Sequence, residues 1–249
     1  MIDHLIKTQQ LAVYKSQQWA ERVYMNSTDF TEPINVSFTW NPDKKKKISD
    51  MLIGIFFEDI NYAADGGLYA VLIQNRDFEY HPDDKEGWDK NWNSYKAWSV
   101  TNENITFRVD SSDPIHINNK NYAVLDIKES GTGFVNEGFD GISLKAGEKY
   151  NFSVYARSKE NRKGKLIIRL ADKDGEIYGE TSTKNITKDW KKYEVVLTAK
   201  KTTDKARLII IPQQTGQVDL DMVSLFPQKT FRGRKNGLRE DLAQTIADM

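Results

Sequence analysis

Apolar and polar residues alternate in short runs over the second half of the chain. The runs that show this pattern are 150–158, 165–172, 176–183, 191–199, 206–212 and 217–225. Turn residues such as Lys173-Asp174-Gly175 separate them. Alternation with a period of two turns one side of each run toward a core, and turns join such runs as antiparallel strands. The pattern therefore predicts a mainly β chain with an antiparallel β-sandwich.

The first part of the chain shows two other strand patterns. Residues 34–40 (INVSFTW) alternate, whereas Met51–Ile60 (MLIGIFFEDI) is almost continuously apolar. A continuous apolar run is typical of a strand buried on both faces, as in parallel sheets and barrel cores. Gly66 and Gly67 then mark a break, and we expect one or two helical turns over Leu68–Ile73.

The end of the chain predicts a helix. Asn236 is the expected N-cap, and Glu240 and Asp241 suit the positive end of a helix. The apolar positions that share one face are Leu238, Leu242, Ile246 and Met249. No following element covers this face, so we expect the chain to be part of a longer polypeptide.

These patterns divide the chain into four parts. Residues 1–33 match no element that we can assign, and 34–74 hold the two early strand patterns. Residues 75–227 hold the sandwich, which is long enough to bury a core of its own and to fold alone. Residues 228–249 hold the helix.

Charge and composition exclude several kinds of partner and chemistry. The 36 basic residues balance the 36 acidic ones, so no global field favours nucleic acid or an anionic membrane. No apolar run of about 18 residues predicts a membrane span, and residues 1–26 do not resemble a signal peptide. The absence of Cys excludes disulfides and thiol nucleophiles, and three scattered His residues give no metal-ligand spacing.

Aromatic residues make up 11% of the chain, which suits sugar binding but also a sandwich core. Trp88, Trp92 and Tyr95 lie in a polar stretch and are the candidates for sugar-stacking platforms. Trp98 opens a strand and is expected in the core. Three further aromatic residues beside turns are candidates for ligand contact or for packing: Phe134, Phe139 and Tyr178.

Two segments resemble glycoside hydrolase family 51 α-L-arabinofuranosidases. They are GIFFEDINYAADGGLYA (Gly54–Ala70) and the final SLFPQKTFRGRKNGLREDLAQTIADM. The region between them is similar to carbohydrate-binding modules of the family 4/9 type. The motifs that carry this second resemblance are NRDFEY, WSV, GEKYNFSVYARS, DWKKYEVVL and VDLDMVSL. Together the matches cover about 51–249.

The resemblance implies a jelly-roll, galactose-binding-like sandwich flanked by the first strand and first helix of an incomplete (β/α)8 barrel. It also implies retaining hydrolysis of terminal arabinofuranosyl residues in arabinoxylan or arabinan, by a pair of carboxylates. In the family that pair lies on later barrel strands, so no catalytic residue is expected in this chain. Its enzymes are often secreted or periplasmic.

The resemblance assigns roles to four further residues. Glu58 would hydrogen-bond arabinose and Asn61 would support it, although a strand-end carboxylate can also satisfy local backbone. Glu79 and Asp221 would hold a structural Ca²⁺ with backbone carbonyls, or they are two unrelated surface carboxylates. An arabinose-containing plant glycan is the expected partner. The alternative is a stand-alone carbohydrate-binding sandwich or a structural spacer.

Overall fold

The computed structural model describes residues 37, 39, 41–44, 46–49, 52, 54, 58, 62–85, 89–160 and 164–248. The chain divides into two compact units, Met1–Ile55 and Phe56–Met249. The strand patterns at 34–40 and 51–60 fall mostly outside the described residues, so both strands stay predictions.

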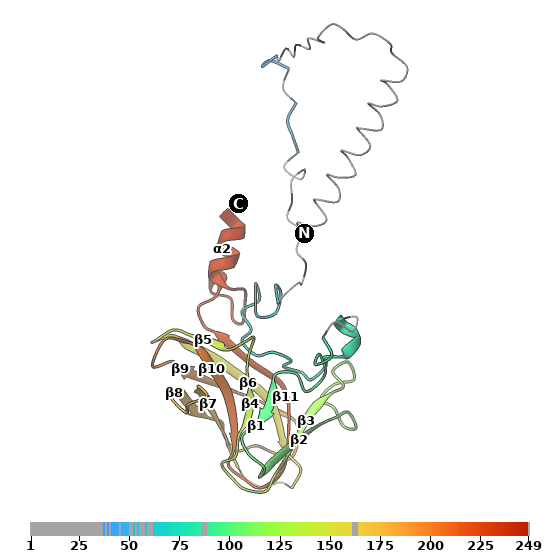
Figure 1. Ribbon diagram of the computed structural model, residues 1–249, viewed down its shortest axis with the longest axis vertical. Coiled ribbons are helices and arrows are strands. Elements are labelled where there is room, and N and C mark those ends of the chain that lie inside the picture. The colour runs from blue at the N-terminus through green and yellow to red at the C-terminus, as the bar shows by residue number, and fades with distance from the viewer. Residues whose placement is uncertain are drawn as a thin grey trace, which may run out of the picture. The chain divides into compact units, whose positions relative to one another are not determined.

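Two antiparallel sheets form the second unit (Figure 1). The first sheet has the order β1-β4-β10-β7-β8, with β5 also paired to β10, and the second has the order β2-β3-β11-β6-β9. The strands of the first sheet are β1 (Trp98–Val100), β4 (Phe134–Asn136), β5 (Ile142–Leu144), β7 (Leu166–Ala171), β8 (Ile177–Ser182) and β10 (Thr203–Pro212). Those of the second are β2 (Ile105–Asp110), β3 (Tyr122–Ile127), β6 (Lys149–Ser158), β9 (Lys191–Thr198) and β11 (Gly216–Pro227).

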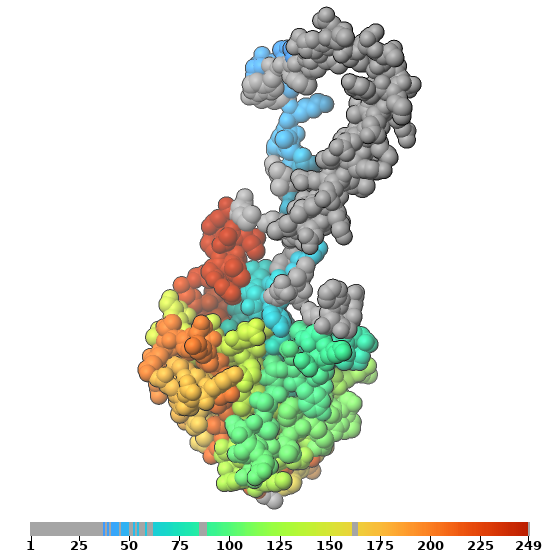
Figure 2. Space-filling view, in the orientation of Figure 1, coloured from blue at the N-terminus to red at the C-terminus, as the bar shows by residue number. Residues whose placement is uncertain are grey.

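This architecture confirms the predicted β-sandwich, and each alternating run of the sequence corresponds to one of the strands β6 to β11. Strands far apart in the sequence pair with one another, as β11 does with β3 and β6. Figure 2 shows the same mixing at the surface, where segments from the two halves of the unit lie side by side on one face.

The core lies between the two sheets. In β10 the residues Ala206, Leu208 and Ile210 are fully buried and belong to it, because alternate side chains of a strand share one face. Burying one such aliphatic side chain contributes about 1.5–3 kcal/mol. Trp98 stacks on Phe134 with ring centroids 4.4 Å apart, so its predicted core position is confirmed.

The segment before the sandwich corrects one prediction, because Leu68–Ile73 forms no helical turn. Leu68 O accepts a hydrogen bond from Arg239 N at 2.9 Å, and Leu72 N donates to Leu225 O at 2.9 Å. Tyr69 bridges Leu238 in antiparallel fashion. These pairings with distant backbone satisfy the groups that a helix would have paired locally.

Helical structure in the described residues is limited to two 3₁₀ turns, η1 (Pro82–Lys85) and η2 (Phe231–Gly233), and to α2 (Glu240–Asp248). The prediction of Asn236 as N-cap is wrong, since the helix begins four residues later. Asn236 instead lies in a turn with φ 53°, and the Arg239 carbonyl accepts the first helical bond from Ala243. No helix among the described residues is long and apolar enough to cross a membrane.

Candidate functional site

The outer face of the first sheet is the face that points away from the core. The register places Val135 of β4 beside Ile209 of β10, and Ile209 beside Arg169 of β7. Arg169 in turn lies beside Glu180 of β8, and its Nε donates to Glu180 Oε2 at 2.7 Å. One row of side chains therefore crosses this face from an apolar centre to an ion pair at its edge.

The centre of the outer face is aliphatic and closed. Its apolar cluster, separate from the main core, contains Val135, Ala171, Ile209 and Ile211, with Ile167 packed against it. The four buried members are only 2–9% exposed. The aromatic residues on these strands are Trp98, Phe134 and Tyr178, and all three belong to the core instead. This face therefore presents no aromatic ring on which a sugar can stack.

A hollow of about 730 Å³ lies at one end of the same sheet. We call it the polar pocket. The loop before β1, the loop 137–141 after β4, the β7–β8 turn and the start of β10 line it. Its polar lining consists of Gln74, Lys96, Glu137, Asp140, Asp172, Lys173, Asp174, Lys205 and Arg207. Four basic side chains thus face four acidic ones, which favours a neutral ligand over a charged one.

Arg207 lies beside the closed apolar cluster and reaches into the polar pocket. Its Nη1 contacts Glu137 Oε1 at 3.3 Å, and its Nη2 donates to the Asp172 carbonyl at 3.1 Å. The remaining Nε is buried and has no hydrogen-bond partner. Two of the guanidinium nitrogens therefore fix the side chain, while the third is left as an unused donor.

Gln74 also lines the polar pocket and carries a second donor without a partner. The residue is 3% exposed, and its Nε2 is buried without a hydrogen-bond partner. Its backbone is held because Asn136 Nδ2 donates to the Gln74 carbonyl at 3.0 Å. A buried amide donor without a partner costs about 1–3 kcal/mol, so its persistence calls for an explanation.

The backbone around the polar pocket adopts left-handed conformations at non-glycine residues. They are Asn75 (φ 50°), Ala97 (φ 67°) and Asp140 (φ 61°). Asn75 secures the loop before β1, since its Nδ2 donates to the carbonyls of Ser94 at 2.9 Å and Lys96 at 3.1 Å. Strained positions of this kind persist where surrounding structure fixes them, and they cluster at binding sites.

The turn between β7 and β8 forms one wall of the polar pocket. Asp172 holds this turn, because its carboxylate accepts hydrogen bonds from Tyr178 Oη at 2.7 Å and from the Glu176 amide at 2.9 Å. These bonds, that from Tyr178 above all, lower the pKa of Asp172 below its usual range. Asp172 is therefore ionised, and its carboxylate is already hydrogen-bonded within the turn.

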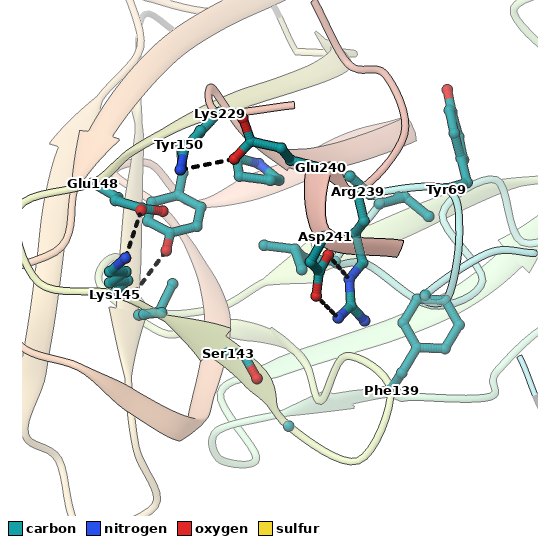
Figure 3. A pocket seen from close by; sticks show the side chains of 17 residues that line it. Tyr69, Phe139, Ser143, Lys145, Glu148, Tyr150, Lys229, Arg239, Glu240 and Asp241 are labelled. Carbon is teal, nitrogen blue, oxygen red and sulfur yellow. Dashed lines mark hydrogen bonds and ion pairs between the residues drawn. The ribbon is translucent and has the colours of Figure 1, made fainter. Parts of the chain in front are cut away.

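A second hollow, of about 460 Å³, lies where the chain enters and leaves the sandwich (Figure 3). We call it the connector pocket, because Gly66–Leu72 and Pro227–Asp241 contribute much of its wall. Every charged side chain labelled there has an opposite partner. The pairs are Arg239–Asp241 at 2.6 Å, Lys229–Glu240 at 2.7 Å and Lys145–Glu148 at 3.6 Å. Tyr69 and Phe139 add aromatic walls.

The outer face of the second sheet carries a buried ion pair and, over β6 and β9, a smaller hollow of about 150 Å³. Arg157 Nε donates to Asp219 Oδ2 at 2.7 Å, and the Arg157 guanidinium also binds Asp113 and stacks over the Trp190 ring. Asp219 is fully buried. Because each of these charges has its partner, the ion pair leaves no unused donor for a ligand.

The predicted stacking residues occupy three different settings. Trp92 is 7% exposed and stacks on Tyr80 with centroids 4.0 Å apart, so the open sugar platform predicted for it is absent from this geometry. Burial raises the pKa of Tyr80 to about 12. Tyr95 is 45% exposed and rests against Phe107, but it lines neither pocket. Trp88 lies outside the described residues.

Of the two residues assigned to arabinose binding, Glu58 is exposed and Asn61 lies outside the described residues. The other aromatic candidates divide between core and pocket. Phe134 and Tyr178 pack in the core, whereas Phe139 lines the connector pocket.

The two residues assigned to calcium lie in one electrostatic neighbourhood. Asp221 accepts hydrogen bonds from Asn119 Nδ2 at 2.7 Å and the Met222 amide at 2.6 Å, and Glu79 accepts two from Asn121. Burial, with smaller contributions from Asp77 and Glu79, raises the pKa of Asp221 to about 8. No group of three or more metal-ligating side chains forms among the described residues.

The unit combines a two-sheet antiparallel sandwich with a preformed, charge-balanced polar pocket. These features are typical of β-sandwich modules that bind small ligands. Comparison with protein families agrees and is more specific. The family model described as "Carbohydrate binding domain" (CBM_4_9) matches residues 70–217, which is more than half of the chain. The chain belongs to this carbohydrate-binding domain family.

Several relatives are named as α-L-arabinofuranosidases. An extracellular exo-α-L-arabinofuranosidase of Streptomyces chartreusis is 38% identical over 85% of this chain and 24% of its own length. α-L-Arabinofuranosidase 1 of Arabidopsis thaliana is 30% identical over 82% of this chain and 30% of its length. The arabinose-bound structure of the MgGH51 α-L-arabinofuranosidase superposes with a TM-score of 0.66, at 30% identity, over 77% of this chain and 32% of that one. The chain spans a quarter to a third of these relatives.

Sequence reasoning did not find the polar pocket. The alternation within β10 places Arg207 on the opposite side from Leu208, which was the one available signal. Nothing in the sequence joins Arg207 to Glu137, which lies 70 positions away, or Gln74 to Asn136, which lies 62 away.

Proposed function

We propose that this sandwich binds a neutral plant glycan containing arabinose, and that the polar pocket is its binding site. The observation that carries the proposal is one charge-balanced hollow whose lining includes Gln74 and Arg207, each with a buried donor that has no partner in the free chain. Sugar hydroxyls accept hydrogen bonds from such donors, and they donate to acceptors such as the Glu137 carboxylate. Membership of a carbohydrate-binding domain family supports the same ligand class.

The wider polypeptide is proposed to be an α-L-arabinofuranosidase. It would remove terminal arabinofuranosyl residues from arabinoxylan or arabinan by a retaining mechanism, in which two carboxylates lie about 5–5.5 Å apart. The names of the relatives support this proposal. Glu58 and Asn61 would contact arabinose in that enzyme. A bound sandwich would hold the polysaccharide near the catalytic centre and raise its local concentration.

Binding is tested by calorimetric titration of the full chain with arabinoxylan, linear arabinan and xylohexaose. Arg207→Lys keeps the charge but loses the planar fork, so affinity should fall about tenfold or more. Arg169→Lys, on the same face outside the pocket, is the matched control and should bind as the parent does. Thermal melting of both variants checks their folding. Absence of binding to all three glycans would make the sandwich a spacer and end the proposal.

Catalysis is tested separately. We expect purified chain to release no nitrophenol from a nitrophenyl α-L-arabinofuranoside, because the family resemblance places both catalytic glutamates outside this sequence. Turnover that survives repurification, and that Glu58→Gln abolishes, would show instead that this chain carries catalytic residues.

We propose further that Glu79 and Asp221 hold a structural Ca²⁺. Their carboxylates are the hard oxygen donors that Ca²⁺ prefers, and a cation there would offset the mutual repulsion of neighbouring acids. Its role would be to tie the segment before β1 to β11. Millimolar CaCl₂ should raise the melting temperature relative to EDTA, and Asp221→Asn should abolish the difference. Equal melting temperatures in both buffers would contradict a calcium site.

A further inference from the structure

We infer that the polar pocket takes the end or a single-residue branch of a glycan, and not the continuous run of a polysaccharide chain. The inference rests on the proposed function and adds to it the mode of binding. It follows from where apolar surface and unpaired hydrogen-bonding groups lie on the outer face of the first sheet.

An extended glycan needs contacts repeated along the face on which it lies. Aromatic rings usually supply them, because their flat faces pack against sugar C–H groups. On this sheet the aromatic side chains Trp98, Phe134 and Tyr178 all point into the core. The four aliphatic side chains at the centre of the outer face are at most 9% exposed, whereas Ile167 beside them is partly exposed and Ile177 at the β8 edge is 39% exposed. The centre of the face therefore offers little apolar surface to successive sugar residues, and no aromatic ring on these strands adds to it.

The polar side chains of the same face differ in whether they already have a partner. Away from the pocket, Arg169 and Glu180 bind each other at 2.7 Å. Gln74 Nε2 and Arg207 Nε, on two residues that line the polar pocket, have no hydrogen-bond partner. Both unpaired donors of this sheet's lining residues therefore belong to the polar pocket, while the unpaired group beyond the other end of β10, Gln214 Oε1, is an acceptor.

The walls of the polar pocket also favour a chain end. The loop 137–141 and the turn Asp172–Asp174 both line it, and both connect strands of the same sheet. Fixed backbone at Ala97 and Asp140 holds the lining in place before a ligand arrives. A preformed pocket of this kind orders few groups on binding, so one or two sugar residues can bind without a long chain of contacts.

The test is a length series titrated into the full chain by calorimetry. The probes are arabinose, linear arabino-oligosaccharides from the disaccharide to the hexasaccharide, and xylotetraose with and without one arabinofuranosyl branch. End binding predicts that affinity changes less than about twofold beyond the disaccharide, and that the branch raises affinity for xylotetraose about tenfold or more, equivalent to 1.4 kcal/mol. Arg169→Lys should leave every affinity unchanged.

Binding along the length of a glycan chain predicts the opposite result. Affinity that climbs about tenfold from disaccharide to hexasaccharide, together with weakened binding in Arg169→Lys, would show a chain lying along the face and overturn the inference. Glycan binding itself would then still stand. Absence of binding to every probe would instead overturn the proposed function, and this inference with it.

Discussion

The polar pocket and the connector pocket are built from similar residues but use them differently. Both are lined by basic and acidic side chains in equal number and by loops that link the elements of the sandwich. In the connector pocket Arg239 and Asp241 form a two-bonded pair. In the polar pocket Arg207 keeps a buried donor free, and so does Gln74.

This difference indicates different roles. A network whose charges are paired holds two chain segments together and leaves little for a ligand to gain. A pocket with buried unpaired donors loses stability in the free protein, and a ligand that pairs those donors recovers it. Aromatic walls alone would have favoured the connector pocket, with Tyr69 and Phe139, so the unused donors decide between them.

The largest expected effect is a loss of stability from crowding the segment 66–72, which lines the connector pocket. A Cβ at Gly67 would overlap the carbonyl oxygens of Tyr62 and Ala63, which belong to the backbone and cannot swing away. Gly67→Ala should therefore destabilise the chain by about 1–3 kcal/mol. Glycan affinity should stay within about twofold, since no polar-pocket residue moves. Thermal melting and calorimetry measure the two effects. Gly54→Ala is the control, because a Cβ there has open space.

At Gln74 we expect a smaller effect, in which glycan affinity falls while stability rises. Gln74→Leu removes the buried unpaired donor while keeping the volume of the side chain. Glycan affinity should fall about fivefold, and stability should rise by up to about 1 kcal/mol, because an unpaired buried amide costs free energy. Gln74→Glu, which keeps an acceptor but loses the donor, separates hydrogen bonding from shape. A variant that binds normally would show that Gln74 does not contact the ligand.

The smallest effect is expected from the paired charges of the connector pocket. The hydrogen bonds from Arg239 lower the pKa of Asp241 below its ordinary 3.8, so the stabilisation is present above that pH and fades as pH falls through the lowered value. Because both side chains are substantially exposed, Asp241→Asn should cost less than about 1 kcal/mol at neutral pH and almost nothing at pH 2. Denaturation at both pH values measures this. An effect on glycan affinity would contradict the separation of the two pockets.

The sequence by itself determined the sandwich and its family. The alternation over β6 to β11 reports which side chains face the core, because the period of two is a property of the strand itself. The motifs between Asn75 and Pro227 were sufficient to indicate the carbohydrate-binding family. The local sequence pattern predicted secondary structure less reliably at helix ends and in the segments that connect elements. Leu68–Ile73 looked helical and Asn236 looked like a cap, since neither pattern reports pairing with backbone far away.

The tertiary structure alone decided which polar and aromatic residues are available to a ligand. Trp92 lies in a polar stretch, yet Tyr80 covers one of its faces. Arg207, Glu137 and Gln74 come from three separated segments, which the pairing of β10 with β4 and the bond from Asn136 to the Gln74 carbonyl bring to one hollow. Exposure and unpaired donors depend on every neighbour in space, whereas the sequence pattern of a strand records only the direction in which each side chain points.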